Sequence, residues 1–413
     1  MKKKVGFYFD ASHLKDFSIE KFEKGLIGIS GTDSSFIRVV IGLSKRADFD
    51  IYFFGKEIGE FPDTNFNSVN SFSHAIELAK EKQIDIFIFN LKINNELDDI
   101  LALAQKIELN LVVWAQNPIP TPTLDRLNAN TAVLKIVFVE DYDLSHIRHK
   151  KGFYKGVVIP NGIEKEVYVR GEIKIPDNLN VFYLGSLTPS KGFHHIAKAW
   201  PKILKKVPNA KLFIIGSGKL YNNHANLGPL GIANEEYERE LMPFIGKNKQ
   251  ELKKNNVECL GLLNRNEVID LIYNSKVGCM NANTFGSLES CSVTSLEVQL
   301  CGVPIIAGKA GGNLNTIINN KTGILIKDQE NELPEAIIRL LTNDQLNLEM
   351  RKAAREYILR KYELRIVIDE WVAFLNKLMQ GQPFPILPVT PELASNKLYA
   401  KEFIRLVNKV LGK

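Results

Sequence analysis

Two successive sets of short apolar runs constrain the fold of this 413-residue chain more than any other feature. Each run carries at most one charged residue, as is typical of strands in a parallel sheet, which are buried on both faces. The first set reads VGFYF, FDIYFFG, IDIFIFN, NLVVWA and AVLKIVFV, and the second reads NVFYLGS, AKLFIIGS, VECLGLL, VGCMNA, VPIIAG and GILIK.

Helical patterns separate these runs, so the sequence predicts two tandem α/β domains with doubly wound parallel sheets. Pro160, Asn161-Gly162, Gly171 and Pro176 interrupt regular structure and place the boundary within residues 158–180. From Asn343 onward the chain is mainly helical, with a proline-rich interruption at 381–391. The expected helices include Ser34–Arg46, Ser73–Lys82, Phe193–Val207, Arg265–Asn274, Leu333–Leu341 and a last one at Glu392–Leu411.

Composition narrows the class of protein. The net charge of +6, from 53 basic and 47 acidic residues, permits anionic ligands or membrane surfaces and does not favour nucleic acid. The four cysteines form no Cys-x-x-Cys pair, which favours free thiols in a reducing compartment over zinc or disulfides. No apolar stretch approaches the roughly 18 residues of a membrane span. We therefore expect a cytoplasmic protein, with peripheral binding to the inner face of the membrane as an option.

The segment HIRHKKGFYKG, residues 146–156, combines basic and aromatic residues. The simpler interpretation is a solvated turn. The alternative is contact with an anionic lipid surface.

Ligands of open α/β sheets bind at the carboxyl ends of the strands, so the loops that follow the strands carry the functional signal. The loop GSLTPSKGF, 185–193, has glycines for tight turns, and its Lys191 precedes a helix where an ammonium can meet a phosphate. A solvated lysine in a turn is the alternative. The shorter GSG, 216–218, is a weak signal on its own.

Glu289 and Glu297 flank a predicted helix start in TFGSLESCSVTSLEVQLCGVPIIAG. A helix start favours anions, so two carboxylates around it suit a ligand with hydroxyls at both ends and a diphosphate between them. A nucleotide sugar is such a ligand. The structural alternatives are a loop carboxylate for Glu289 and a capping box with Thr294 for Glu297.

Several motifs occur in one order and together resemble the retaining glycosyltransferases of family 4, which have the GT-B fold. The resemblance is close over the second domain and looser over the first. It implies two Rossmann-like domains that face each other across a cleft, with a C-terminal helix that crosses back to the first. The domains would be 1–165 on the acceptor side, 166–365 for the nucleotide sugar, and 366–413 as the helical segment. The motifs are NG (161–162), G-x-L-x-P-x-K-G-F (185–193), IIGSG (214–218), the paired glutamates, CGVP (301–304) and AGG (310–312).

The resemblance also implies roles in the second domain. Glu297 would hold the ribose, Glu289 the transferred sugar, and Lys191 the charge that grows on the leaving diphosphate. Backbone N–H groups at Ser292 and Val293 would bind the diphosphate, next to the Gly216 loop. No metal or other cofactor is then expected.

This chain departs from the family pattern in three respects, of which the first, serines at positions 290 and 292 where the family often has glycine, is tolerable because serine is small. Ser186 stands where the family usually has an arginine that binds phosphate, so Arg265, Lys309 or Arg38 would have to substitute for it. Gln116 stands where the family often has a histidine near the donor sugar. A glutamine carries no proton but can hydrogen-bond the sugar, so we expect a positioning role.

In the first domain, Gly28, Gly31 and Thr32 precede a helix and resemble the family's glycine loop that faces the diphosphate. The alternative is an ordinary N-capped helix. Asp10 and His13 follow the first strand and are expected on the acceptor side.

The expected function is retaining transfer of a sugar from a nucleotide sugar, a UDP-sugar by preference, to a glycan, lipid-linked or other hydroxyl acceptor. Polysaccharide or glycoconjugate synthesis is the expected role. The alternatives are a non-catalytic partner subunit, suggested by Ser186, and a sugar-nucleotide 2-epimerase. A nicotinamide-dependent dehydrogenase fits less well, because no Gly-x-Gly-x-x-Gly run follows the first strand.

Overall fold

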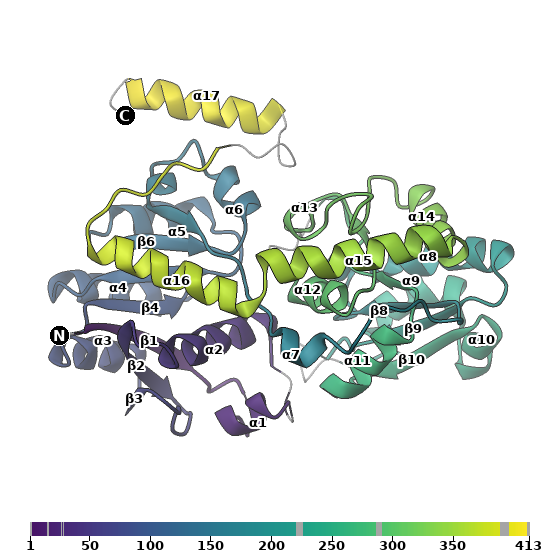
Figure 1. Ribbon diagram of the computed structural model, residues 1–413, viewed down its shortest axis with the longest axis horizontal. Coiled ribbons are helices and arrows are strands. Elements are labelled where there is room, and N and C mark those ends of the chain that lie inside the picture. The colour runs from purple at the N-terminus through teal and green to yellow at the C-terminus, as the bar shows by residue number, and fades with distance from the viewer. Residues whose placement is uncertain are drawn as a thin grey trace. The chain divides into compact units, whose positions relative to one another are not determined.

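The chain forms two compact units in a computed structural model that describes residues 2–14, 16–25, 27, 29–219, 226–285, 291–388 and 396–410. Unit 1 contains Met1–Gly162 together with Leu364–Lys413, and unit 2 is the continuous stretch Ile163–Glu363. Figure 1 shows strands of each unit flanked by helices.

Unit 1 is built on a seven-stranded sheet in the order β3-β2-β1-β4-β5-β6-β7, with every pair parallel. The strand order reverses between β1 and β4, which makes their carboxyl ends a topological switch point. The strands are β1 (Lys3–Asp10), β2 (Phe49–Lys56), β3 (Asn65–Ser68), β4 (Ile86–Asn90), β5 (Leu111–Ala115), β6 (Val133–Phe138) and β7 (Gly156–Val158).

Helices from both ends of the chain cover this sheet. They are α1 (Ile19–Glu23), α2 (Gly31–Ser44), α3 (Phe72–Glu81), α4 (Glu96–Lys106), α5 (Thr121–Ala129), α6 (Asp141–His146), the 3-10 helix η1 (Lys151–Lys155), α16 (Leu364–Met379) and α17 (Asn396–Val410).

The helix α16 returns to unit 1 after the whole of unit 2, as the resemblance predicted. It packs beside α2, where Gly42 leaves room for the Ile368 side chain: a Cβ there would lie 2.5 Å from Ile368 Cδ1. The ring centroids of the buried Trp114, on β5, and Trp371, on α16, are 4.7 Å apart. The helix α16 is thus part of the core of unit 1, where paired aromatic rings such as these bury a large apolar surface.

Unit 2 has a six-stranded parallel sheet in the order β10-β9-β8-β11-β12-β13, with its own switch point between β8 and β11. Its strands are β8 (Asn180–Leu184), β9 (Lys211–Ile215), β10 (Val257–Gly261), β11 (Val277–Cys279), β12 (Ile305–Gly308) and β13 (Gly323–Ile326). Its helices are α7 (Lys165–Tyr168), η2 (Pro189–Lys191), α8 (Phe193–Lys206), α9 (Glu235–Ile245), α10 (Lys249–Lys254), α11 (Arg265–Tyr273), α12 (Val293–Leu300), α13 (Asn313–Thr316), α14 (Glu332–Thr342) and α15 (Asp344–Lys361).

Every strand expected from the apolar runs is present. The parallel pairing follows from those runs, because these strands are buried along most of their length, except the edge strand β10, in which only Val257 is buried.

Candidate active site

The loop that carries Lys191 is fixed to the loop after β11, at the switch point of unit 2. The amide Nδ2 of Asn281 donates to the carbonyl of Ser190 at 3.0 Å, and that of Asn283 donates to the same carbonyl at 2.9 Å. Gly192 at the loop's end has φ +72°, and a Cβ there would lie 2.9 Å from the backbone nitrogen of Ala282. The ends of β8 and β11 therefore hold Lys191 in one place.

Two further side chains shape this loop. Tyr183 on β8 directs its hydroxyl back onto the carbonyls of Ser186 (2.8 Å) and Lys191 (3.3 Å). The Asn283 oxygen lies 3.1 Å from His195 Nε2 and must accept, because the asparagine nitrogen already donates to the loop. Burial lowers the pKa of His195, so the ring is neutral and carries its proton on Nε2.

Gly216 brings the end of β9 against this loop. It has φ +134°, and a Cβ there would lie 1.8 Å from the Gly185 carbonyl oxygen, a clash that excludes any other residue from this backbone. The ends of β8 and β9 are thus packed backbone to backbone, and the Gly185 N–H donates to the Ile215 carbonyl at 3.0 Å.

The helix α12 begins with Ser292 as N-cap, whose hydroxyl accepts from the N–H of Ser295 at 3.2 Å. Val293 is the first helical residue, so its N–H and that of the next residue point out of the helix start without intrahelical partners. The sequence predicts that this helix start binds an anion, because unpaired N–H groups and the positive end of a helix favour negative charge. The helix start therefore lies at the carboxyl edge of the sheet, as expected for a diphosphate site.

Glu297 lies in the second turn of α12 and is held by a tyrosine. The hydroxyl of the buried Tyr168, on α7, donates to Glu297 Oε1 at 2.6 Å. The predicted capping box with Thr294 is wrong, because Ser292 is the cap and Glu297 is too far along the helix to reach back to it. Glu297 is thus oriented by a partner 129 residues away.

Ser186, where an arginine was expected, is 1% exposed, and its hydroxyl lies 3.5 Å from the Ser217 carbonyl. The three cations that could replace that arginine differ in position. Arg38 is buried in unit 1 over the Phe22 ring, and Lys309 lines a different cavity beside β13.

Arg265 is the first residue of α11, after the Asn264 cap, and four positions past Gly261, whose carbonyl accepts from the Gly216 N–H at 2.8 Å. Across the part of the chain that the structure describes, no residue forms an ion pair or hydrogen bond with the Arg265 guanidinium. Of the three candidates it is the one next to the Gly216 loop.

Gln116 follows β5 in unit 1, where it forms a reciprocal amide pair with Asn161. Gln116 Nε2 donates to Asn161 Oδ1 at 3.2 Å, and Asn161 Nδ2 donates to Gln116 Oε1 at 2.9 Å. Both side chains are buried. The amide that we expected near the sugar is therefore engaged within unit 1, and its contact with a donor stays a prediction.

The start of α2 is an ordinary capped helix, as the alternative for this segment predicted. Ser30 caps it, and Gly31 and Thr32 belong to its first turn. The Asp33 carboxylate accepts from the Ser30 hydroxyl at 2.7 Å and lies 3.0 Å from His13 Nε2. A carboxylate thus already occupies the positive end of this helix, which disfavours a second anion there.

Asp10 and Asp33 line one small cavity with Tyr8 and Asn90, at the switch point between β1 and β4. Burial opposes ionisation of Asp10, but hydrogen bonds from Ser12 and Lys56 outweigh it and lower its pKa. The expected acceptor-side residues Asp10 and His13 therefore meet around Asp33. Glu289 and Gly28 lie outside the described residues.

The sequence did not single out Tyr168, Tyr183, Asn281 or Asn283. A signal existed for the asparagines, since NAN directly follows the short strand β11 at the edge where ligands bind. Tyr168 acts through a partner 129 residues away, which no local pattern reveals. Tyr183 donates to carbonyls only three and eight residues further along the chain.

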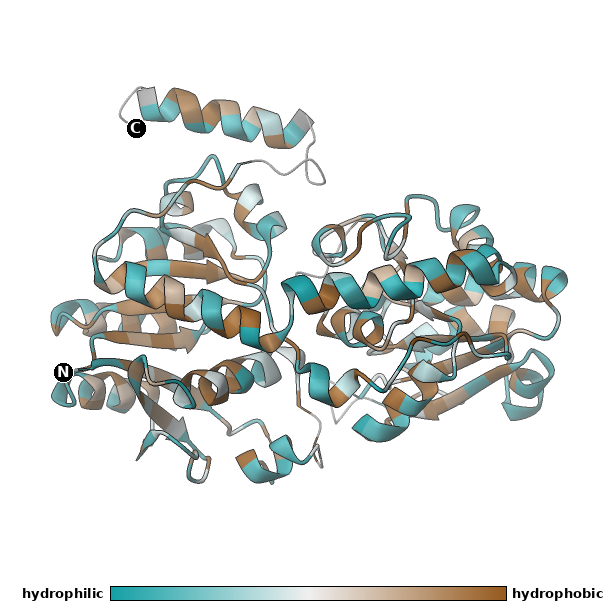
Figure 2. Ribbon diagram, viewed as in Figure 1, coloured by the Kyte–Doolittle hydropathy of each residue, from teal (hydrophilic) through white to brown (hydrophobic). Residues whose placement is uncertain are grey.

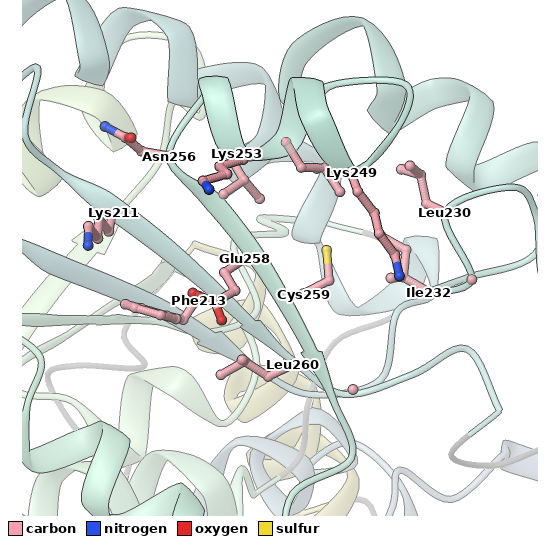
Figure 3. Close-up of a pocket in the computed structure, with 14 residues that line it drawn as sticks. Lys211, Phe213, Leu230, Ile232, Lys249, Lys253, Asn256, Glu258, Cys259 and Leu260 are labelled. Atoms are coloured by element: carbon pink, nitrogen blue, oxygen red, sulfur yellow. The ribbon is translucent and has the colours of Figure 1, made fainter.

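Within the described ranges, no cluster of three His, Cys, Asp or Glu side chains could hold a metal ion. All four cysteines are free thiols. A separate cavity of about 730 Å³ lies along the edge strand β10, away from the predicted residues, and Figure 3 shows Lys249, Lys253 and Cys259 among its lining. Burial raises the pKa of the Cys259 thiol to about 12, so this thiol is a poor nucleophile.

Comparison with solved structures identifies the fold. Sucrose-phosphate synthase from Thermosynechococcus elongatus aligns with a TM-score of 0.67 at 13% identity, over 92% of this chain and all of that one. Anabaena HepE in complex with UDP-glucose aligns with a TM-score of 0.63 at 16% identity, over 91% of this chain and 99% of that one. The chain has the GT-B fold.

Comparison with known sequences indicates the class of enzyme. Residues 168–357 match the family described as glycosyl transferases group 1. A GDP-mannose-dependent monoacylated alpha-(1-6)-phosphatidylinositol monomannoside mannosyltransferase from Corynebacterium glutamicum is 22% identical over 398 residues, 90% of this chain and 94% of that one. A GDP-mannose-dependent alpha-(1-6)-phosphatidylinositol monomannoside mannosyltransferase from Mycobacterium tuberculosis is 24% identical over 277 residues, 64% of this chain and 67% of that one.

The chain is therefore a glycosyltransferase with the GT-B fold, and residues 168–357 of unit 2 are the part that matches the group 1 family. The relatives named above are transferases, so the alternatives of a partner subunit and an epimerase find no support in them. Within the described residues, no helix is both long and apolar enough to span a bilayer.

Proposed function

We propose that this protein transfers a sugar from a nucleoside diphosphate sugar to a hydroxyl acceptor with retention of configuration, in the manner of family 4. The observation that carries the proposal is the switch point of unit 2. There the Lys191 loop is fixed by Asn281 and Asn283, on the edge of the sheet where α12 begins. A cation and free helix N–H groups on one edge suit a diphosphate.

The acceptor is a glycan, a lipid-linked sugar or another hydroxyl compound, with a role in polysaccharide or glycoconjugate synthesis. For the donor we expected a UDP-sugar. The relatives aligned above by sequence are named for GDP-mannose, whereas HepE was solved with UDP-glucose. GDP-mannose is therefore the first donor to test, and UDP-glucose the second.

In the proposed reaction the bond between the sugar's anomeric carbon and the diphosphate oxygen breaks. A bond from the acceptor oxygen to that carbon forms on the same face, and the acceptor proton passes to the departing phosphate oxygen. Negative charge grows on the diphosphate, so positive groups around it lower the barrier. Lys191, Arg265 and the N–H groups at Ser292 and Val293 would supply this charge, without a metal ion.

Glu297 would bind the ribose hydroxyls, since the Tyr168 hydrogen bond fixes the carboxylate near the α12 start. Glu289, eight residues earlier in the chain, would bind the transferred sugar. Two carboxylates would then hold the hydroxyl groups at either end of the donor while the helix start holds the diphosphate between them.

Calorimetric titration with GDP, UDP, GDP-mannose and UDP-glucose tests the donor assignment. We expect one nucleotide to bind and Glu297→Ala to weaken it at least about tenfold, because a carboxylate with two ribose hydroxyls contributes about 1.5–3 kcal/mol. Glu332→Ala is the control, since its carboxylate accepts only from the Lys327 and Asp328 N–H groups in the 327–332 turn. Equal loss in both variants, or no binding by the unaltered protein, would overturn the assignment.

The anomeric configuration of the product, read by proton NMR from the first turnovers, tests retention separately. An inverted product would reject the family 4 mechanism and leave the nucleotide site intact.

A further inference from the structure

The C-terminal helix α17 lies on unit 1 with its polar face inward. Glu402 accepts from the buried guanidinium of Arg148 at 3.2 Å and from Arg405 Nε at 2.8 Å. Lys401 donates to the His146 carbonyl at 2.9 Å. This side of the helix is therefore attached to α6 and the segment after it by charged groups, the reverse of an ordinary surface helix.

The outward face of α17 is apolar. Phe403 is 68% exposed and Tyr399 57%, and they are joined on the same arc by Ile404, Leu406 and Val407. These five are half of the ten large apolar side chains that the described residues expose. Figure 2 shows brown, hydrophobic bands between teal, hydrophilic ones along α17. Such a concentrated apolar surface indicates a binding face.

Positive charge surrounds this face. The helix has four cationic residues, Lys397, Lys401, Arg405 and Lys409, and one acidic residue, Glu402. Lys397 and Lys409 are exposed. The segment 146–156 beneath the helix adds Lys150 and Lys151 and contains no acidic residue. A protein partner needs no such excess of cations, whereas an anionic bilayer surface attracts it.

Unit 1 exposes further apolar side chains near the inner side of α17. Tyr154 and Ile386 are exposed, and they line an apolar cavity of about 430 Å³ with Phe153 and Phe384. Phe153 lies under the Arg405 guanidinium, 5.9 Å from it, so this cavity adjoins the inner side of the helix. The basic and aromatic segment 146–156 is thus the platform of α17 and not only a solvated turn.

We propose that α17 is a membrane-docking helix, whose outward face inserts at the interface of a bilayer that contains anionic lipids. The apolar arc supplies the burial and the flanking lysines supply the attraction to negative headgroups. Arg148 and Glu402 connect the docked helix to unit 1. This inference goes beyond the sugar transfer proposed above and does not depend on which donor the protein uses.

Cosedimentation of the full chain with vesicles tests the proposal. We expect binding to phosphatidylcholine vesicles that contain phosphatidylglycerol, and much weaker binding to phosphatidylcholine alone. Phe403→Glu combined with Leu406→Glu should weaken binding at least about tenfold, because two inserted side chains are replaced by charges repelled by the surface. Lys409→Glu should weaken binding about fivefold or more in the anionic vesicles only.

Leu262→Glu is the matched control, since Leu262 is an equally exposed leucine in unit 2, where we expect no effect on vesicle binding. Circular dichroism melting of each variant checks that the fold is kept. We expect it to be kept, because the altered side chains are exposed. Vesicle binding that is absent, or that is unchanged by the double substitution, would overturn the proposal.

Sedimentation equilibrium without vesicles tests the alternative that a second copy of the chain covers the apolar face of α17. A dimer that dissociates in the Phe403→Glu, Leu406→Glu protein would overturn the proposal in favour of an interface between two copies of the chain. A monomer whose vesicle binding is lost in the same variant supports membrane docking. Failure of nucleotide binding would leave this result unaffected, so the two proposals fail separately.

Discussion

The hydroxyl of Tyr168 donates a 2.6 Å hydrogen bond to Glu297 across 129 residues of the chain. Tyr168 is itself fixed, because its carbonyl accepts from the Tyr273 hydroxyl at 2.8 Å. Two tyrosines from outside α12 therefore set the direction of a carboxylate on it. A carboxylate oriented before the ligand arrives loses less entropy on binding.

Tyr168→Phe should weaken nucleotide binding about fivefold to tenfold, the effect of one hydrogen bond of about 1–1.5 kcal/mol. Calorimetry measures the change. Tyr362→Phe is the control, since the Tyr362 hydroxyl also donates a buried hydrogen bond, to the Asn315 carbonyl at 2.8 Å. Similar losses of affinity in both variants would show that Tyr168 acts only on stability.

Asn283→Ala should lower kcat about tenfold or more, because Lys191 is then less firmly placed against the departing diphosphate. Steady-state kinetics with the best donor measures it. Asn180→Ala removes a comparable bond, from Asn180 Nδ2 to the Asn274 carbonyl at 2.9 Å, from the strand end opposite the site. If it lowers kcat as much, the asparagine at 283 has no special positioning role.

Arg265→Ala should weaken diphosphate binding by about 1–2 kcal/mol if this guanidinium replaces the arginine absent at position 186. Lys309→Ala is the control. It removes a cation that lines the cavity beside β13, so the affinity of this variant for nucleotide should not change. Titration with GDP and UDP at low and high salt compares the two. A larger effect at Lys309 would reverse the assignment.

Gly216→Ala should destabilise unit 2 by about 3 kcal/mol or more, since the new Cβ would collide with the Gly185 carbonyl. Gly171→Ala is the matched control: its φ is +64°, but no atom lies within 4 Å of the added Cβ. It should cost only about 1 kcal/mol of backbone strain. Thermal melts compare the two variants. Equal decreases in Tm would mean that the backbone contact between Gly216 and Gly185 has relaxed to accept the added Cβ.

The protein should lose stability as the pH falls from about 6.5 to 4, in part through His194. Burial lowers the pKa of this histidine from 6.5 to about 4, so over that range the unfolded chain binds a proton that the folded chain does not. His194→Gln should reduce the loss of unfolding free energy over this pH range by about 1 kcal/mol, a figure that allows for the partial exposure of the ring. Urea unfolding at pH 7 and 4.5 measures it, and parallel profiles would exclude this histidine as the cause.

The sequence predicted the two sheets well, because strands buried on both faces must be apolar along their whole length. It missed the edge strands β3 and β7, since β3 has the mostly polar sequence NFNS and β7 has only three residues. Helix α9, between β9 and β10, packs in the core of unit 2, where Leu241 and Ile245 are fully buried.

The site was predicted only in part, for a different reason. Glycines, a helix start and a lysine leave local patterns, so the loops after β8, β9 and β11 were found. The partners of these groups were not, because Tyr168 meets Glu297 and Asn161 meets Gln116 only after folding. Pairings of side chains distant in sequence are properties of the packed structure.

The return of α16 to unit 1 has a consequence for the order of folding. Unit 2 is one continuous stretch inserted between the two parts of unit 1, and Trp371 reaches Trp114 only when nearly the whole chain has left the ribosome. Unit 2 can therefore complete its core first, although its sequence starts later. Until then the surface of α2 and β5 that α16 covers stays open, and a nascent chain stalled before residue 364 exposes it to chaperones.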